Sequence, residues 1–212
     1  CQWVQSRKEN IGVGVDLDKK VLNWGRRNNL SKLKAEQKSR LTLLHDNVLT
    51  VNSTPTDIIM AMNFSYFIFK ERGVLKEYFQ KCRQSLNHGG VLFLDAFGGS
   101  DAFVELEEET KYGYFTYIWD QSRYNPITGE IKCHIHFKFR DGSEMKRAFT
   151  YDWRLWTLPE IQELLAEAGF ANISVFWEGT DKASCEGNGV FRPTHKGEAD
   201  EAWITYITAE NV

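Results

Sequence analysis

Four short apolar runs alternate with helical patterns in the first half of the chain, and this alternation restricts the fold more than any other feature. The runs are rich in Val, Ile, Leu and Met, as is typical of strands that are buried on both faces of a parallel sheet. They cover residues 10–16, 40–46, 56–63 and 91–97. Strands that alternate with helices predict an α/β domain with a mostly parallel sheet.

Three segments between and after these runs have the pattern of helices. Residues 18–30 begin with Asp18 as an acidic N-cap, and residues 71–86 place apolar side chains at helical spacing. The clearest helix covers 157–170, where Thr157 and Glu160 have the spacing of a capping box.

The second half of the chain has a different pattern. Three segments alternate apolar and polar residues and are separated by turn signals, which predicts an antiparallel meander of three strands. They cover residues 113–120, 131–139 and 144–153. We interpret 98–153 as an inserted β meander whose first part, 98–112, is a charged and partly helical connector. After the last helix we expect a strand at 172–179, a polar loop at 179–200 and a final strand at 201–210.

Composition excludes several classes of protein. A length of 212 residues suits one domain, so we expect a single domain over 1–212. The net charge of −3 and the scattered Lys and Arg residues argue against nucleic acid as the partner. No apolar run approaches the ~20 residues that span a bilayer, so no membrane partner is expected. The four cysteines lack paired spacing, which favours reduced thiols in a cytoplasmic protein; they are Cys1, Cys82, Cys133 and Cys185.

Two predicted strands end on an acid, at Asp16 and at Asp46. In an open parallel sheet, ligands bind beyond the carboxyl ends of the strands, so both acids should face the same edge. A carboxylate at the end of one strand can accept from the two hydroxyls of a ribose. A carboxylate at the end of the next strand can accept from the exocyclic amine of a purine. The alternative is that Asp16 and Asp18 cap the following helix while Asp46 starts a turn. The two acids in this order favour a nucleoside ligand.

The segment directly after the third strand, residues 62–67, also carries polar groups. Asn63 offers two donors and an acceptor, and Ser65 and Tyr66 offer hydroxyl groups that would face the ligand cleft. An equally good interpretation is that Asn63 and Ser65 cap the next helix.

His134 and His136 share one face of a predicted strand, whereas Cys133 points to the other face. Two ligands are too few for a zinc site, so no metal is predicted. Either histidine, or Tyr66, is a candidate general base if the substrate must lose a proton.

Aromatic residues are dense in the insert and at its exit. They pack either in the core or as a wall that excludes water from a reacting centre, and such a wall would suit an amine through cation–π contact. The set consists of Tyr114, Tyr117, Trp119, Tyr124, Tyr151, Trp153 and Trp156.

The order of these elements resembles the class I S-adenosylmethionine-dependent methyltransferases. The stretches that carry the resemblance are "GVGVDLDKKVLNWG", "LTLLHDNVLTV", the segment from "TDIIMAMN" through "NHGGVLFLDAF", and "TLPEIQELLAEAGFANISVFWE". The resemblance covers residues 10–97 and 154–210. The chain is similar in particular to an uncharacterised, mainly bacterial branch of this family. It implies a Rossmann-like sheet with an antiparallel last strand, and an acceptor site built by the insertion at 98–153.

The resemblance also implies roles for individual residues. The cofactor would be S-adenosyl-L-methionine, with Asp16 on the ribose hydroxyls, Leu17 against the adenine and Asp46 on the adenine amine. Further cofactor contacts would come from Asn47, Val48, Met62 and Asn63. The candidate catalytic residues are Tyr66, His134 and His136, and the candidate substrate contacts are Tyr66, Tyr117, Trp119 and Trp153.

The family's first strand and its Gly-x-Gly loop have no counterpart in the chain. That strand normally lies between the strands that end here at Asp16 and at Met62. We therefore expect residues before Cys1 in the natural protein that supply it, with a strand from another chain as the alternative.

The predicted activity is transfer of a methyl group from the cofactor to a nitrogen or oxygen nucleophile of a small molecule, by in-line SN2 displacement. Two alternatives remain open at this stage. One is a non-catalytic binding protein with the same fold. The other is an NAD(P)-dependent oxidoreductase, which also has an acid after its second strand, although the expected antiparallel final strand argues against it.

Overall fold

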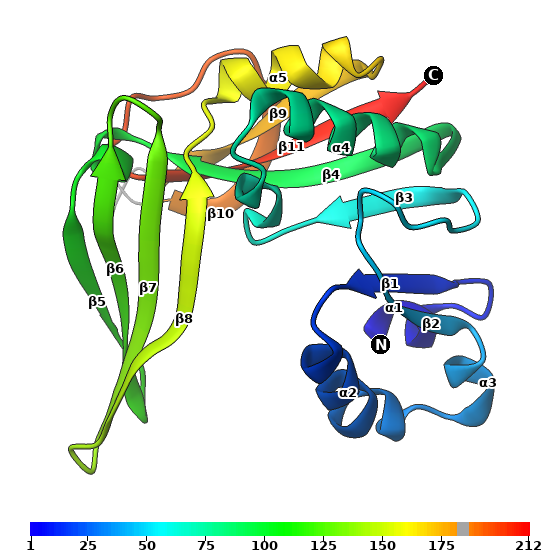
Figure 1. The fold of residues 1–212 in the computed structure, drawn as a ribbon, viewed down its shortest axis with the longest axis horizontal. Coiled ribbons are helices and arrows are strands. Elements are labelled where there is room, and N and C mark those ends of the chain that lie inside the picture. The colour runs from blue at the N-terminus through cyan, green and yellow to red at the C-terminus, as the bar shows by residue number, and fades with distance from the viewer. Residues whose placement is uncertain (182–186) are drawn as a thin grey trace. The chain divides into compact units, whose positions relative to one another are not determined.

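The computed structural model describes residues 1–181 and 187–212, which form two compact units, 1–54 and 55–212 (Figure 1). Cys185 and part of the predicted loop at 179–200 lie outside the described residues. Each unit is described by itself, and the single domain over 1–212 stays a prediction.

The first unit is a β–α–β arrangement. Strand β1 (Gly12–Asp16) pairs in parallel with β2 (Leu41–His45), and helix α2 (Lys19–Asn28) connects them. The Asp18 carboxylate caps α2 by accepting from the backbone N–H of Lys20 at 2.7 Å. The unit also contains α1 (Gln2–Ser6), the 3₁₀ turn η1 (Leu30–Lys32) and α3 (Ala35–Lys38).

The second unit is built on a five-stranded sheet with the order β10-β9-β11-β4-β3. Strand β3 (Thr56–Ala61) is parallel to β4 (Leu86–Gly98), whereas β11 (Trp203–Asn211) runs antiparallel to both β4 and β9 (Ala171–Thr180). The last strand therefore has the direction expected from the sequence.

One part of the predicted loop at 179–200 is in fact a strand. Residues Gly187–Thr194 form β10, which pairs antiparallel with β9 at the edge of the sheet. Most of its side chains are exposed, so the segment has no alternation of apolar residues that could reveal a strand. Its backbone pairing with β9, which no local pattern encodes, decides its conformation.

Helices α4 (Arg72–Gln84) and α5 (Leu158–Glu167) lie on the same side of this sheet in Figure 1. The predicted capping box of α5 is confirmed, since Glu160 accepts the Thr157 backbone N–H at 2.9 Å and Thr157 accepts the Glu160 N–H at 3.5 Å. Both helices bury apolar faces. The fully buried core side chains include Leu75, Phe79, Leu92, Leu94, Ile161, Leu164, Leu165 and Ile207.

The insert forms a four-stranded antiparallel sheet with the order β5-β6-β7-β8. Its strands are β5 (Leu106–Lys111), β6 (Phe115–Asn125), β7 (Glu130–Phe139) and β8 (Glu144–Arg154). The insert has four strands and not the predicted three, because the charged connector supplies β5. The helical part of that connector is limited to the 3₁₀ turn η3 (Ser100–Phe103). Exposed charges suit an edge strand, where they discourage pairing with other chains.

Strands β1 and β3 are among the strands that keep one unpaired edge within the described residues. Strand β1 pairs only with β2, and β3 pairs only with β4. Apolar side chains on these strands are exposed, including Val13 at 40% and Met60 at 66%. The expected further strand concerns residues outside this chain and stays a prediction.

None of the helices in the described ranges is long and apolar enough to cross a membrane.

Candidate functional site

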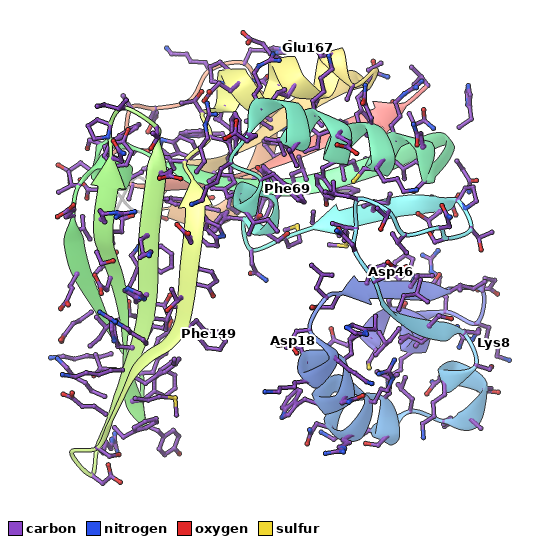
Figure 2. All side chains as sticks on the ribbon, in the orientation of Figure 1. Lys8, Asp18, Asp46, Phe69, Phe149 and Glu167 are labelled. Carbon is purple, nitrogen blue, oxygen red and sulfur yellow. The ribbon has the colours of Figure 1, made fainter. Side chains whose placement is uncertain are left out.

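Asp16 and Asp46 are neighbours at the carboxyl ends of two parallel strands. Asp16 is the last residue of β1 and is in register with His45, the last residue of β2. The backbone N–H of Asp46 donates to the carbonyl oxygen of Asp16 at 3.2 Å. The sequence-based expectation that both acids lie at one edge is therefore correct for the first unit. Figure 2 labels Asp46 and the nearby helix cap Asp18.

Both carboxylates already hold their own loops. Oδ1 of Asp16 accepts the backbone N–H of Asp18 at 2.7 Å, and Oδ1 of Asp46 accepts that of Asn47 at 2.7 Å. The second oxygen of each carboxylate has no hydrogen bond among residues 1–181 and 187–212. Asp16 is half-buried and Asp46 is exposed, so these oxygens remain available to donors on a ligand.

Leu17 lies next to these acids with 63% of its surface exposed. Nε2 of His45 lies 2.9 Å from the carbonyl oxygen of Leu17, which ties the loop after β1 to the end of β2. An exposed Leu beside two strand-terminal acids suits the face of a purine ring. His45 was not among the predicted site residues, since its contact depends on the register of two strands.

The adjoining residues of the β2 loop form a compact turn. Oδ1 of Asn47 accepts the Leu49 backbone N–H at 3.0 Å, and both Asn47 and Val48 are half-buried. The hydrogen bond fixes the conformation of the loop that contains Asn47 and Val48, which were both predicted to contact a cofactor.

In the second unit, the turn after β3 has an unusual backbone. Asn63 and Phe64 have φ angles of 59° and 54°, a left-handed conformation that costs free energy for residues other than glycine. The carboxylate of Asp95 compensates by accepting the N–H of Asn63 at 2.7 Å and that of Phe64 at 2.8 Å. Asp95 is only 6% exposed, and its burial raises its pKa while the two backbone hydrogen bonds lower it.

Asp95 was not among the predicted site residues, although an acid inside the apolar run at 91–97 is the signal that could have identified it. Its neighbours in the turn differ in exposure: Met62 is half-buried and Asn63 is exposed. Asn63 therefore presents its side chain to solvent, as a ligand contact requires.

Tyr66 is placed in the core and not at the surface of a cleft. It lies in the 3₁₀ turn η2 (Ser65–Ile68), is 1% exposed, and donates its hydroxyl to the carbonyl oxygen of Asp95 at 2.7 Å. Burial raises its pKa well above the ordinary value, which opposes a role as base. This geometry suits a structural role and gives no support to the predicted roles in catalysis and substrate binding.

Aromatic residues gather on one face of the insert sheet. Tyr117 and Trp119 are two positions apart on β6, and Tyr151 and Trp153 are two positions apart on β8, so each pair points to the same face. The rings of Tyr151 and Trp153 stack with 4.3 Å between their centroids. The ring of Trp119 lies 6.2 Å from Tyr151 and 6.4 Å from Trp153. The structure thus brings four members of the predicted aromatic set to one face, whereas Tyr114 is 82% exposed and the ring of Tyr124 packs against Phe103.

Trp153 is 3% exposed and reaches the core sheet. Its ring lies 6.4 Å from that of Phe97 on β4 and 6.1 Å from that of Phe64. Trp153 therefore supports the wall from behind, whereas the half-buried Tyr117, Trp119 and Tyr151 retain accessible surface.

His134 and His136 lie on the opposite face of the insert sheet from this wall, because strand neighbours point to opposite faces. Nε2 of His136 lies 3.1 Å from Oδ2 of Asp120, and Nδ1 of His136 accepts the backbone N–H of Arg147 at 3.0 Å. Nδ1 of His134 lies 2.9 Å from Oγ1 of Thr150, and burial lowers the pKa of His134. The structure does not bring the candidate bases together with the candidate substrate contacts.

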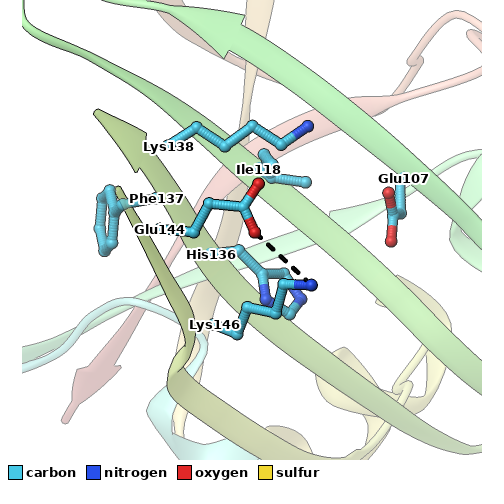
Figure 3. A pocket seen from close by; sticks show the side chains of 7 residues that line it. All are labelled: Glu107, Ile118, His136, Phe137, Lys138, Glu144 and Lys146. Carbon is cyan, nitrogen blue, oxygen red and sulfur yellow. Dashed lines mark ion pairs between the residues drawn. The ribbon is translucent and has the colours of Figure 1, made fainter. Parts of the chain in front are cut away.

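A pocket of about 300 Å³ opens on this histidine-bearing face (Figure 3). Its charged side chains partly neutralise one another, as in the Glu144–Lys146 pair at 3.5 Å. The lining residues are Glu107, Ile118, His136, Phe137, Lys138, Glu144 and Lys146. Across residues 1–181 and 187–212, no group of three or more His, Cys, Asp or Glu side chains is arranged to hold a metal ion.

Comparison with known proteins gives one kind of match. No family model and no curated protein sequence matches the chain. Among solved structures, the chain is similar to an S-adenosylmethionine-dependent methyltransferase from Clostridium acetobutylicum ATCC 824, with a TM-score of 0.66 and 18% identity. That alignment covers 96% of this chain and 76% of the other.

Two further structures are similar over most of the chain. The amino pentose methyltransferase CalS10 from Micromonospora echinaspora has a TM-score of 0.60 and 14% identity, over 94% of this chain and 73% of its own. The sugar N-methyltransferase KedS8 from Streptoalloteichus sp ATCC 53650 has a TM-score of 0.56 and 15% identity, over 93% and 70%. The chain therefore has the fold of the S-adenosylmethionine-dependent methyltransferases that its sequence resembles.

Proposed function

We propose that this protein is a methyltransferase that binds S-adenosyl-L-methionine and methylates a small molecule. The observation that carries the proposal is the Asp16–Asp46 pair at the ends of two neighbouring parallel strands, where the Asp46 N–H donates to the Asp16 carbonyl oxygen. The parallel pairs β1–β2 and β3–β4 and the antiparallel β11 support the finer interpretation of a Rossmann-like sheet.

The residues of the first unit fit the nucleoside part of this cofactor. The free oxygen of Asp16 would accept from ribose hydroxyls, and the exposed Leu17 would pack on the adenine. Asp46 would accept from the adenine amine, with Asn47 and Val48 completing the edge of that site. In the second unit, Met62 and Asn63 would border the methionyl end.

We assign the acceptor side to the aromatic face of the insert. When bound, the cofactor would supply an electrophilic methyl group on its sulfonium, so the protein must hold a nucleophile in line and exclude water. Tyr117 and Trp119 offer aromatic surface to an amine, and Trp153 holds the wall against the core. The similar structures named for amino pentose and sugar N-methylation support a nitrogen nucleophile.

This assignment leaves both histidines outside the chemistry. An uncharged amine attacks with its own lone pair, so a base has less to contribute than it would for a hydroxyl acceptor. The engagement of both ring nitrogens of His136 agrees with this.

Calorimetric titration of the full-length natural protein with S-adenosylmethionine tests the proposal. Asp16→Asn should weaken binding at least tenfold, because an amide replaces one charged acceptor of the ribose hydroxyls. Asp18→Asn is the matched control, since it removes a carboxylate two residues away and Asn still caps a helix. Its affinity should stay within twofold of the wild type.

The outcomes separate the three candidate functions. Absence of binding by the full-length protein would overturn the proposal. Binding without transfer to any amine or hydroxyl acceptor would favour a non-catalytic binding protein, and binding of a nicotinamide dinucleotide instead would favour an oxidoreductase.

A further inference from the structure

Asp95 is a buried charge that the proposed chemistry does not use directly. It follows the β4 residue Leu94, which is in register with Ala61, the last residue of β3. This position sets its carboxylate beside the turn that leaves β3. Its two oxygens accept the N–H groups of two successive residues, Asn63 and Phe64.

Burial of this carboxylate is costly, and the two hydrogen bonds offset only part of the cost. The pKa of Asp95 is raised overall, so its charged form is less favourable in the folded chain than in water. A side chain chosen only for packing at this position would be apolar, as its strand neighbours Leu94 and Ala96 are. The carboxylate has a specific local effect, which is to hold two residues in the left-handed region.

The turn that Asp95 holds contributes residues to two parts of the proposed site. It contains Met62 and Asn63, which we assign to the methionyl end of the cofactor. It also contains Phe64, whose ring lies 4.8 Å from Phe97 and 6.1 Å from Trp153 at the base of the aromatic wall. A change in the backbone of this turn would therefore move cofactor contacts and the support of the wall together.

We propose that Asp95 is a positioning residue, which fixes the 62–64 turn so that Asn63 meets the cofactor while Phe64 supports the acceptor wall. This inference rests on the proposed function. The inference goes beyond the proposed function because it assigns control over the cofactor side and the acceptor side to a buried acid that belongs to neither set of contacts.

The test uses Asp95→Asn in the full-length protein, with kinetics measured at a temperature where the variant is folded. The amide keeps the volume of the side chain but replaces one acceptor oxygen with a donor, so one of the two N–H groups loses its partner. We expect kcat to fall at least tenfold and KM for S-adenosylmethionine to rise at least threefold.

Asp57→Asn is the matched control. Asp57 is an exposed acid at the other end of β3 and accepts from the Asn87 amide at 2.8 Å. Its kcat and KM should remain within twofold of the wild type. A purely structural role for Asp95 would lower the amount of folded enzyme, and hence the apparent kcat, without moving KM.

Hydrogen exchange of the cofactor-free protein gives a second readout. The amides of Asn63 and Phe64 should exchange at least tenfold faster in Asp95→Asn, whereas the amides of α5 should not change. The inference would be overturned, and the proposed function left intact, if the wild type is active and Asp95→Asn changes neither KM nor the exchange of these amides. A wild type that neither binds the cofactor nor transfers methyl groups would overturn both, whatever the exchange data show.

Discussion

The ring of Phe64 meets the ring of Trp153 edge-on, at 83° between planes and 6.1 Å between centroids. Phe64 belongs to the turn after β3, whereas Trp153 belongs to the last strand of the insert. The contact joins the insert to the core sheet at the end of β4, where Phe97 packs against both rings. The aromatic wall is thus anchored to the same turn that carries Asn63.

The aromatic wall should control the affinity for the acceptor. Trp119→Ala removes a half-buried indole whose ring lies near that of Tyr151. Loss of a cation–π contact of about 0.5–2 kcal/mol would raise KM for an amine acceptor roughly 2- to 30-fold. Steady-state kinetics with an amine identified by product screening measures this. Tyr114→Ala removes a ring that is 82% exposed, and its KM should stay unchanged. Equal effects of the two substitutions would contradict the wall.

His136 should matter for stability and not for catalysis. His136→Ala leaves the Asp120 carboxylate and the Arg147 N–H without their partner, so we expect a loss of about 1–3 kcal/mol in the free energy of unfolding. Urea denaturation measures the loss, with His195→Ala at an exposed position as control. A variant of wild-type stability that has lost methyl transfer would instead support the sequence-based prediction of a catalytic histidine.

Trp156 should be among the largest single contributors to the stability of the second unit. It is 1% exposed, donates Nε1–H to the Phe69 carbonyl at 3.1 Å, and has the Arg154 guanidinium 3.7 Å from its ring centroid. Trp156→Ala should cost about 3–5 kcal/mol, and Trp156→Phe should cost less because most of the apolar volume remains. Trp24→Ala, at a residue that is 61% exposed, provides the control in the same urea experiment. An equally small effect of both alanine substitutions would disprove the assignment.

Glu167 should make stability depend on pH in the acid range. Arg72 and Lys76 on α4 hold its pKa at about 2, below the ordinary 4.5. Because the folded pKa is the lower one, the stabilisation is fully present above pH 4.5 and is lost as the pH falls towards 2. These groups are accessible to solvent, so the effect should be small and screened by salt.

Comparison of Glu167→Gln with the wild type measures this dependence. The melting temperatures should differ at pH 6 in low salt, and the difference should shrink both on acidification and in about 1 M salt. Glu77→Gln on the exposed side of α4 should show no such trend. A difference that is constant from pH 6 to pH 3 would refute an ionic origin.

Local signals in the sequence were sufficient for the elements that have their own periodicity or caps. The four apolar runs became strands, the Thr157–Glu160 capping box began a helix, and Asp16 and Asp46 ended neighbouring parallel strands. Each of these features depends on residues within a few positions of one another. The physical reason is that burial on both faces, or a satisfied helix end, leaves a pattern along the chain itself.

Tertiary structure decided what depends on partners distant in sequence. Strands β5 and β10 are polar edge strands whose conformation comes from pairing with β6 and β9. The ring of Tyr66 packs on Phe67 and Phe79, and its buried hydroxyl donates to the Asp95 carbonyl, 29 residues away.

The sequence by itself thus determined the class of fold, the two acids at adjoining strand ends and the presence of an aromatic wall. Only the tertiary structure revealed that Asp95 holds the turn after β3 and that the two histidines lie on the opposite face from that wall. Those facts depend on the register between strands, where a shift of one residue would exchange the two faces of the insert, and no local pattern in the chain encodes that register.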